Sequence, residues 1–76
     1  MSNKITVYTK NSCPQCEFTK RVLKSNNVAF EERNLDTDEE ALEIVKGLGF
    51  AAAPVVVAEG KEPFSGFQPD KLEELF

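Results

Sequence analysis

Two cysteines, Cys13 and Cys16, are the residues of this 76-residue chain whose type and spacing best suit them to chemistry. They are separated by two residues, follow a strand-like segment and stand at a predicted helix start, a pattern typical of dithiol–disulfide exchange. Residues i and i+3 in the first turn of a helix lie about 5 Å apart, which is within the range of a disulfide. The spacing therefore predicts a redox-active pair.

The helix start predicts different roles for the two sulfurs. Unpaired N–H groups and the positive end of the helix dipole favour a thiolate, so the pKa of Cys13 should be lowered. Cys16 lies inside the first turn and is more shielded. We therefore expect Cys13 to attack a partner disulfide and Cys16 to resolve the mixed disulfide. Lys10 adds positive charge nearby, Pro14 stiffens the turn, and Gln15 places a neutral polar side chain beside the sulfurs.

Other uses of this cysteine pair are weighed against redox chemistry. A disulfide that closes a two-residue gap constrains the unfolded chain very little, and a reducing compartment disfavours it. The pair is also half of a zinc knuckle, but the chain has no histidine and no further cysteine to complete four soft ligands. Zinc or an iron–sulfur cluster shared between two chains, and inert cysteines in an interaction domain, remain as alternatives. We expect no bound metal or cofactor.

Composition restricts the class of protein. The length suits one domain, residues 1–76, and a formal charge of -4 argues against nucleic acid, whose phosphates require a basic patch. No apolar run approaches the roughly 18–20 residues that span a membrane. The segment Met1–Lys4 leads at once into a strand-like stretch and does not resemble a signal sequence. We therefore expect a cytoplasmic monomer.

The apolar pattern predicts strands over residues 5–9, 28–35, 55–58 and 61–65. Helices should begin at Pro14, after a capping box of Thr37 and Glu40, and at Pro69. Their expected inward faces consist of the apolar residues Phe18, Val22, Leu23, then Ala41, Ile44, Val45, Leu48, and last Leu72, Leu75 and Phe76.

The resulting order, β-α-β-α-β-β-α, predicts an α/β fold. Two β-α-β-like crossings should give parallel neighbours, and the closing hairpin should add an antiparallel edge. Helices are expected on both faces of a mixed sheet. Pro54, directly before the third strand, follows Ala53 in an X-Pro bond, for which the residues alone leave both isomers open, although only about 5–6% of such bonds are cis.

Several segments together resemble the glutaredoxin-like branch of the thioredoxin superfamily, and most closely the NrdH-redoxins. They are the strand of residues 5–9, the loop 10–12, the Cys13-Pro14-Gln15-Cys16 motif, Ala53-Pro54, and the segment Phe64-Ser65-Gly66-Phe67-Gln68-Pro69. The resemblance covers essentially the whole chain. Its specificity lies in the combination of C-x-Q-C, A-P-V-V-V and S-G-F-x-P.

This resemblance implies a thioredoxin-like fold, with a four-stranded mixed sheet flanked by three helices. Such redoxins are reduced by thioredoxin reductase at the expense of NADPH and pass electrons to class Ib ribonucleotide reductase. The only redox group would be the Cys13–Cys16 disulfide. The proline at Pro54 would be cis and lie against that disulfide, while the backbone of Ala53 would pair with an extended substrate segment.

The resemblance also predicts a partner-binding segment formed by Phe64, Ser65, Gly66 and Phe67. Either phenylalanine could instead fill the core. Where the family usually has Val or Met, Trp and Arg, this chain has Pro14, Phe64 and Gln68.

A glutathione-dependent glutaredoxin is the alternative within the superfamily. Such proteins usually carry tyrosine at the position of Gln15 and an acidic residue at that of Gln68, whereas Lys10 matches a position that holds a glutathione carboxylate. Asp70, one helix turn away, is a possible substitute for the missing carboxylate.

Overall fold

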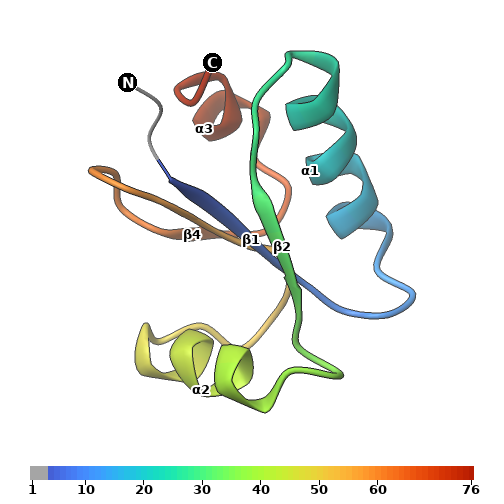
Figure 1. The fold of residues 1–76 in the computed structure, drawn as a ribbon, viewed down its shortest axis with the longest axis vertical. Coiled ribbons are helices and arrows are strands. Elements are labelled where there is room, and N and C mark those ends of the chain that lie inside the picture. The colour runs from blue at the N-terminus through green and yellow to red at the C-terminus, as the bar shows by residue number, and fades with distance from the viewer. Residues whose placement is uncertain (1–3) are drawn as a thin grey trace.

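The computed structural model describes residues 4–76 and confirms the predicted order of strands and helices (Figure 1). The prediction that residues 1–3 lead directly into the first strand lies outside the described residues. Among residues 4–76, no helix is both long and apolar enough to cross a membrane. The elements are β1 (Ile5–Thr9), α1 (Pro14–Ser25), β2 (Glu31–Asn34), α2 (Glu39–Gly47), β3 (Val55–Ala58), β4 (Phe64–Ser65) and α3 (Pro69–Glu73).

The four strands form one mixed sheet in the order β2-β1-β3-β4. β1 and β2 are parallel, as predicted, and β3 and β4 form the antiparallel hairpin. The expectation of a second parallel crossing was wrong, because β3 runs antiparallel to β1. β3 starts at the end of the sheet where β2 finishes. The segment that contains α2 therefore does not carry the chain back to the other end, as a parallel crossing would.

The sheet is covered on both faces, as expected. On one face Val7 and Val56 pack with Leu23 of α1 and Leu72 of α3. On the other face Tyr8 and Val55 pack with Ala41 and Val45 of α2. Because successive side chains of a strand point to opposite faces, the short apolar strands β1 and β3 supply both cores. Figure 1 shows α2 lying apart from α1 and α3.

Helix α1 is rotated relative to the predicted inward face. Its buried residues are Cys16, Thr19 and Leu23, whereas Phe18 is 47% exposed. Thr19 tolerates burial because its hydroxyl donates a hydrogen bond to the carbonyl of Gln15, 2.9 Å away. The expectation that Phe18 faces the core was therefore wrong.

Helix α2 begins one residue later than the capping box predicted. Asp38 is the N-cap, and its carboxylate accepts a hydrogen bond from the N–H of Ala41. Arg33 of β2 donates to the same carboxylate at 3.0 Å, which favours Asp38 over Thr37 as the cap. Ile44 and Leu48, expected to face inward, are 37% and 43% exposed, because this short helix turns only Ala41 and Val45 fully toward the sheet.

Three smaller expectations about the ends of elements were also wrong. β2 covers residues 31–34 and not 28–35, and β4 covers 64–65 and not 61–65. Paired residues of β4 are limited to Phe64 and Ser65, which oppose Val56 and Val55. Phe76 does not face inward, since it is 51% exposed beyond the end of α3, whereas Leu72 is fully buried.

Replacing Leu23 with alanine should lower the free energy of unfolding by about 2–5 kcal/mol, because a fully buried side chain between α1 and the sheet is lost and a cavity remains. Urea unfolding followed by circular dichroism measures the change. The matched control is Phe76→Ala, in which an exposed side chain is removed. A similar loss in both variants would contradict the assigned core.

The Asp38 cap should give a pH-dependent contribution to stability. The N–H of Ala41 and then the Arg33 guanidinium hold the pKa of this carboxyl below its usual range. A lowered pKa in the folded state stabilises the protein above the ordinary aspartate pKa and loses effect as pH falls through the folded value. Asp38→Ala should therefore be less stable than the wild type at pH 7, with the difference shrinking below about pH 4.

Urea unfolding at pH 7 and pH 3 tests this. Asp38→Asn should retain part of the stability at pH 7, since an asparagine oxygen also caps a helix. A difference between the wild type and Asp38→Ala that is unchanged at pH 3 would contradict the role of the ionised carboxylate.

Candidate active site

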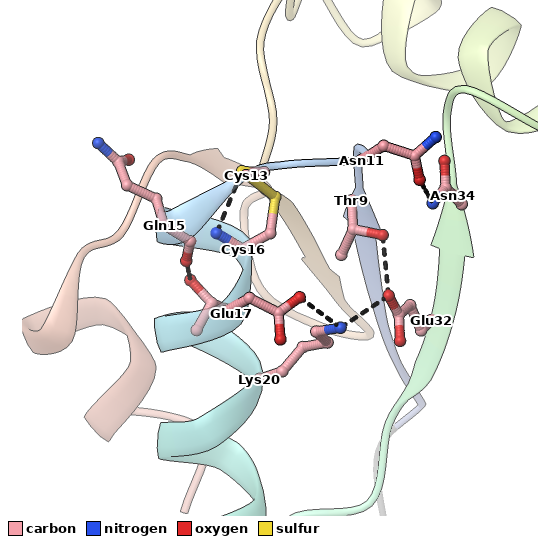
Figure 2. A network of polar contacts seen from close by, with 10 residues as sticks. Thr9, Asn11, Cys13, Gln15, Cys16, Glu17, Lys20, Glu32 and Asn34 are labelled. Atoms are coloured by element: carbon pink, nitrogen blue, oxygen red, sulfur yellow. Dashed lines mark hydrogen bonds and ion pairs between the residues drawn. A yellow bond between two sulfur atoms is a disulfide. The ribbon is translucent and has the colours of Figure 1, made fainter.

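The Cys13–Cys16 disulfide lies at the beginning of α1 (Figure 2). Cys13 is the N-cap with an extended backbone, and Pro14 occupies the first turn, where its missing N–H is not needed. The two Cα atoms are 5.2 Å apart, as predicted for residues one helical turn apart. The backbone N–H of Cys16 donates a hydrogen bond to the sulfur of Cys13 at 3.2 Å. This N–H group would stabilise a thiolate on Cys13 once the disulfide is reduced.

The two sulfurs differ in their access to solvent. Cys16 is fully buried, whereas Cys13 is partly exposed. An incoming partner can therefore reach Cys13 and not Cys16, which supports the attacking and resolving roles predicted for them. Among residues 4–76, no three His, Cys, Asp or Glu side chains are gathered so that they could hold a metal ion.

The loop that precedes Cys13 is held by residues that follow β2. Asp36 accepts a hydrogen bond from the N–H of Asn11 at 2.8 Å and pairs with the ammonium group of Lys10 at 3.4 Å. Asn34 donates to the side chain of Asn11 at 3.0 Å (Figure 2). The N–H of Asn11, and secondarily Lys10, hold the pKa of Asp36 below its usual range.

Asp36 and Asn11 were not predicted as residues of the site. The sequence did contain a clue to them, because neighbouring parallel strands finish at the same end of a sheet. The two loops that follow β1 and β2 must therefore meet there. Lys10, predicted to lie near the sulfurs, does border the site, but its ammonium group also pairs with Asp36.

A groove of about 450 Å³ runs past the disulfide. Its walls include seven of the predicted site residues and three that were not predicted, Asn11, Ser12 and Ala52. The predicted ones are Lys10, Cys13, Pro14, Gln15, Ala53, Ser65 at the end of β4, and Gly66 directly after it.

The Ala53–Pro54 peptide bond is cis, as the resemblance implied. Pro54 is buried, and its carbonyl accepts a hydrogen bond from the N–H of Gly66 at 2.8 Å. Within residues 4–76, none of the loop hydrogen bonds uses the backbone of Ala53, which borders the groove. Its N–H and C=O thus have no partner among these loop hydrogen bonds.

Gln15 joins α1 to the loop that follows β4. Its side-chain oxygen accepts a hydrogen bond from the N–H of Phe67 at 3.2 Å. Gly66, which directly precedes Phe67, has a φ of 85°, a backbone conformation that disfavours any side chain. The ring of Phe67 also contacts Phe18 of α1, with 5.9 Å between ring centroids. Phe18, which was predicted to lie in the core, is thus a neighbour of the site.

The remaining predicted partner-binding residues separate into different environments. Phe64 is only 8% exposed and belongs to the core, so it takes the packing role that was the alternative. Phe67 is partly exposed beside the groove and also packs against the core that contains Leu23 and Leu72, so its alternative packing role is met in part. The amide of Gln68 donates to the carbonyl of Ser65 at 2.6 Å and is thereby turned toward its own loop.

A second polar network connects α1 to the sheet (Figure 2). Thr9, almost fully buried, donates to the carboxylate of Glu32 at 3.0 Å, and the ammonium group of Lys20 binds the same carboxylate at 3.0 Å. Lys20 also pairs with Glu17. The bond with Lys20 is the main cause that lowers the pKa of Glu32, and the bond with Glu32 is the main cause that raises the pKa of Lys20. The carboxylate of Glu32 in β2 thus links Lys20 of α1 to Thr9 of β1.

Comparison with known proteins agrees with this geometry. The sequence profile of the glutaredoxin family matches residues 5–62. The glutaredoxin-like protein NrdH of Lactococcus lactis is 44% identical over 93% of this chain and 97% of its own length. That of Escherichia coli is 43% identical over 95% of this chain and 88% of its own.

The solved structure of the NrdH-redoxin from Escherichia coli superimposes with a TM-score of 0.90 at 41% identity, covering 96% of this chain and 95% of that one. The family match and the structural match thus agree with the fold described above and with a cysteine pair at the start of α1. The chain belongs to the glutaredoxin family, as an NrdH-like thiol–disulfide oxidoreductase with its active-site disulfide between Cys13 and Cys16.

Proposed function

We propose that this protein carries electrons from NADPH, through thioredoxin reductase, to a protein disulfide, and that class Ib ribonucleotide reductase is the acceptor. The observation that carries the proposal is the partly exposed Cys13 beside a buried Cys16, at a groove bordered by Ala53, whose backbone takes part in no loop hydrogen bond within residues 4–76. The NrdH-redoxin of Escherichia coli is a glutaredoxin-like protein with a thioredoxin-like activity profile, which supports the choice of reductase. The acceptor rests on the resemblance to NrdH-redoxins. The protein would act as a cytoplasmic monomer.

In the reducing half of the cycle, a dithiol of the reductase attacks the Cys13–Cys16 disulfide. The attack forms a mixed disulfide on the accessible sulfur of Cys13 and releases the thiolate of Cys16, which takes up a proton. The second thiol of the reductase then displaces Cys13. Two electrons enter the protein, and the reductase dithiol is oxidised to a disulfide.

In the oxidising half, the thiolate of Cys13 attacks one sulfur of the acceptor disulfide and releases the other as a thiolate. Cys16 loses its proton and attacks the sulfur of Cys13 in the mixed disulfide, which restores the Cys13–Cys16 bond and releases the acceptor in its dithiol form. The N–H of Cys16 stabilises the attacking thiolate, and the backbone of Ala53 aligns the acceptor segment.

Glutathione is the alternative reductant, and the groove offers it less charge than a glutathione site needs. Gln68 is neutral and its amide is engaged with the carbonyl of Ser65. Lys10 and Pro14 are glutaredoxin-like features, but the ammonium group of Lys10 is shared with Asp36. These contacts favour a protein reductase over the small anionic thiol.

Substitution of each cysteine separates the two roles. Cys13→Ser should abolish turnover of a protein disulfide, because no accessible nucleophile remains. Cys16→Ser should retain attack by Cys13 but accumulate a covalent mixed disulfide with the acceptor. Non-reducing electrophoresis and mass spectrometry detect this adduct. Full turnover by Cys13→Ser would contradict the redox function and favour an interaction domain with incidental cysteines.

The reductant is tested by NADPH oxidation with insulin as the disulfide substrate. Turnover should be rapid with thioredoxin reductase and at least about tenfold slower with glutathione and glutathione reductase, since the groove lacks the charge-assisted bond to the glutathione ammonium. The control is a glutathione-dependent glutaredoxin measured under the same conditions. Faster turnover with glutathione would reassign the protein as a glutaredoxin.

A further inference from the structure

The loop between β1 and the disulfide is anchored by a side chain at the point where the pairing of β1 with β2 ends. At that point the N–H of Leu35 donates to the carbonyl of Thr9, at 2.7 Å. Two residues after Thr9, the N–H of Asn11 donates instead to the carboxylate of Asp36, at 2.8 Å. The side chain of Asp36 thus extends the attachment between the two strands into the loop before Cys13.

This anchor is itself held in place. The backbone N–H of Asp36 donates to the side-chain oxygen of Asn34 at 2.8 Å. The amide nitrogen of Asn34 in turn donates to the side-chain oxygen of Asn11 at 3.0 Å (Figure 2). The other carboxylate oxygen of Asp36 pairs with the ammonium group of Lys10 at 3.4 Å. Asn11 is therefore bound through both its backbone and its side chain.

Between this anchor and α1, a single residue makes the turn. Pro14 has a fixed φ, and Cys13, which precedes a proline, is confined to an extended backbone, with φ of -114° and ψ of 99°. Ser12 adopts a φ of 55°, in the left-handed region that residues other than glycine rarely occupy. Such a conformation persists only where its surroundings enforce it. Here the constraints are the anchored Asn11 on one side and Pro14 on the other.

We propose that Asp36 is a positioning residue for disulfide exchange at Cys13. By holding the backbone of Asn11, it keeps Ser12 in the left-handed conformation. The sulfur of Cys13 is thereby kept 3.2 Å from the backbone nitrogen of Cys16, whose N–H stabilises the attacking thiolate. Without the anchor, Ser12 relaxes, this N–H bond is lost, and less thiolate is present at a given pH.

Electrostatics alone predicts the opposite effect, which separates the two explanations. Among residues 4–76, Lys10 is the only charged side chain that borders the groove, and on α1 the ammonium group of Lys20 pairs with Glu17. Removing the carboxylate of Asp36 leaves Lys10 without its partner. An unpaired cation near the sulfur of Cys13 favours the thiolate, whereas loss of the anchor disfavours it.

The test measures alkylation of reduced Cys13 by iodoacetamide as a function of pH, with the modified sulfur located by mass spectrometry. Asp36→Asn and Asp36→Ala remove the same charge and release Lys10 equally, but only asparagine offers an oxygen to the N–H of Asn11. The midpoint of the pH profile should lie at least about 0.5 pH unit higher in Asp36→Ala than in Asp36→Asn. Adding Ser12→Gly to Asp36→Ala should recover part of this difference, since glycine adopts a positive φ without the anchor.

Ile5→Ala is the control for a general loss of stability, because it removes a buried side chain at the opposite end of β1 and should leave the midpoint unchanged. Asp36 is exposed, so its variants should keep the fold, which circular dichroism checks. Equal midpoints in Asp36→Ala and Asp36→Asn would overturn the proposal, as would an equal shift in Ile5→Ala or no recovery with Ser12→Gly. Iodoacetamide replaces both protein partners, so the result does not depend on which reductase or acceptor the protein uses.

Discussion

The hydrogen bond from the backbone N–H of Cys16 to the sulfur of Cys13 is the interaction on which the rest of the structure depends. It exists only if α1 begins at Pro14, with Cys13 as an extended N-cap. That start in turn requires the chain to leave β1 at Thr9 and turn within three residues. The sheet, the loop and the helix are thus arranged around one sulfur, which is given an N–H group, the positive end of a helix and access to a partner.

The site is assembled from loops at one end of the strands of the sheet. The parallel pair β1 and β2 ends there, and antiparallel β3 begins there at the cis Ala53–Pro54 bond. Asp36 holds the loop before Cys13, and Gln15 holds the loop after β4. Loops fixed at both sides by hydrogen bonds present a preformed groove, so little conformational entropy is lost when an extended partner segment binds.

The polar residues in the interior serve the position of α1. Thr19 and Thr9 are almost fully buried, yet each hydroxyl has a partner, Gln15 in one case and Glu32 in the other. No buried side-chain nitrogen or oxygen within residues 4–76 lacks a hydrogen bond. This rotation of the helix places Cys16 inside and leaves Phe18 outside, next to the ring of Phe67. The face of α1 that packs against the sheet therefore determines both the burial of Cys16 and the exposure of Phe18.

By itself, the sequence determined the order of elements, the helix start at Pro14 and the place of the cysteine pair at that start, because these depend on local spacing and backbone chemistry. Residues distant in sequence decided the rest. The direction of β3 depends on the end of the sheet at which the chain arrives after α2. The contact between Asp36 and Asn11 depends on two strands ending side by side. The exposure of Phe18 depends on which face of α1 packs against the sheet. Apolar periodicity indicates that a helix has an inward face, but the packing free energy of the assembled core selects that face.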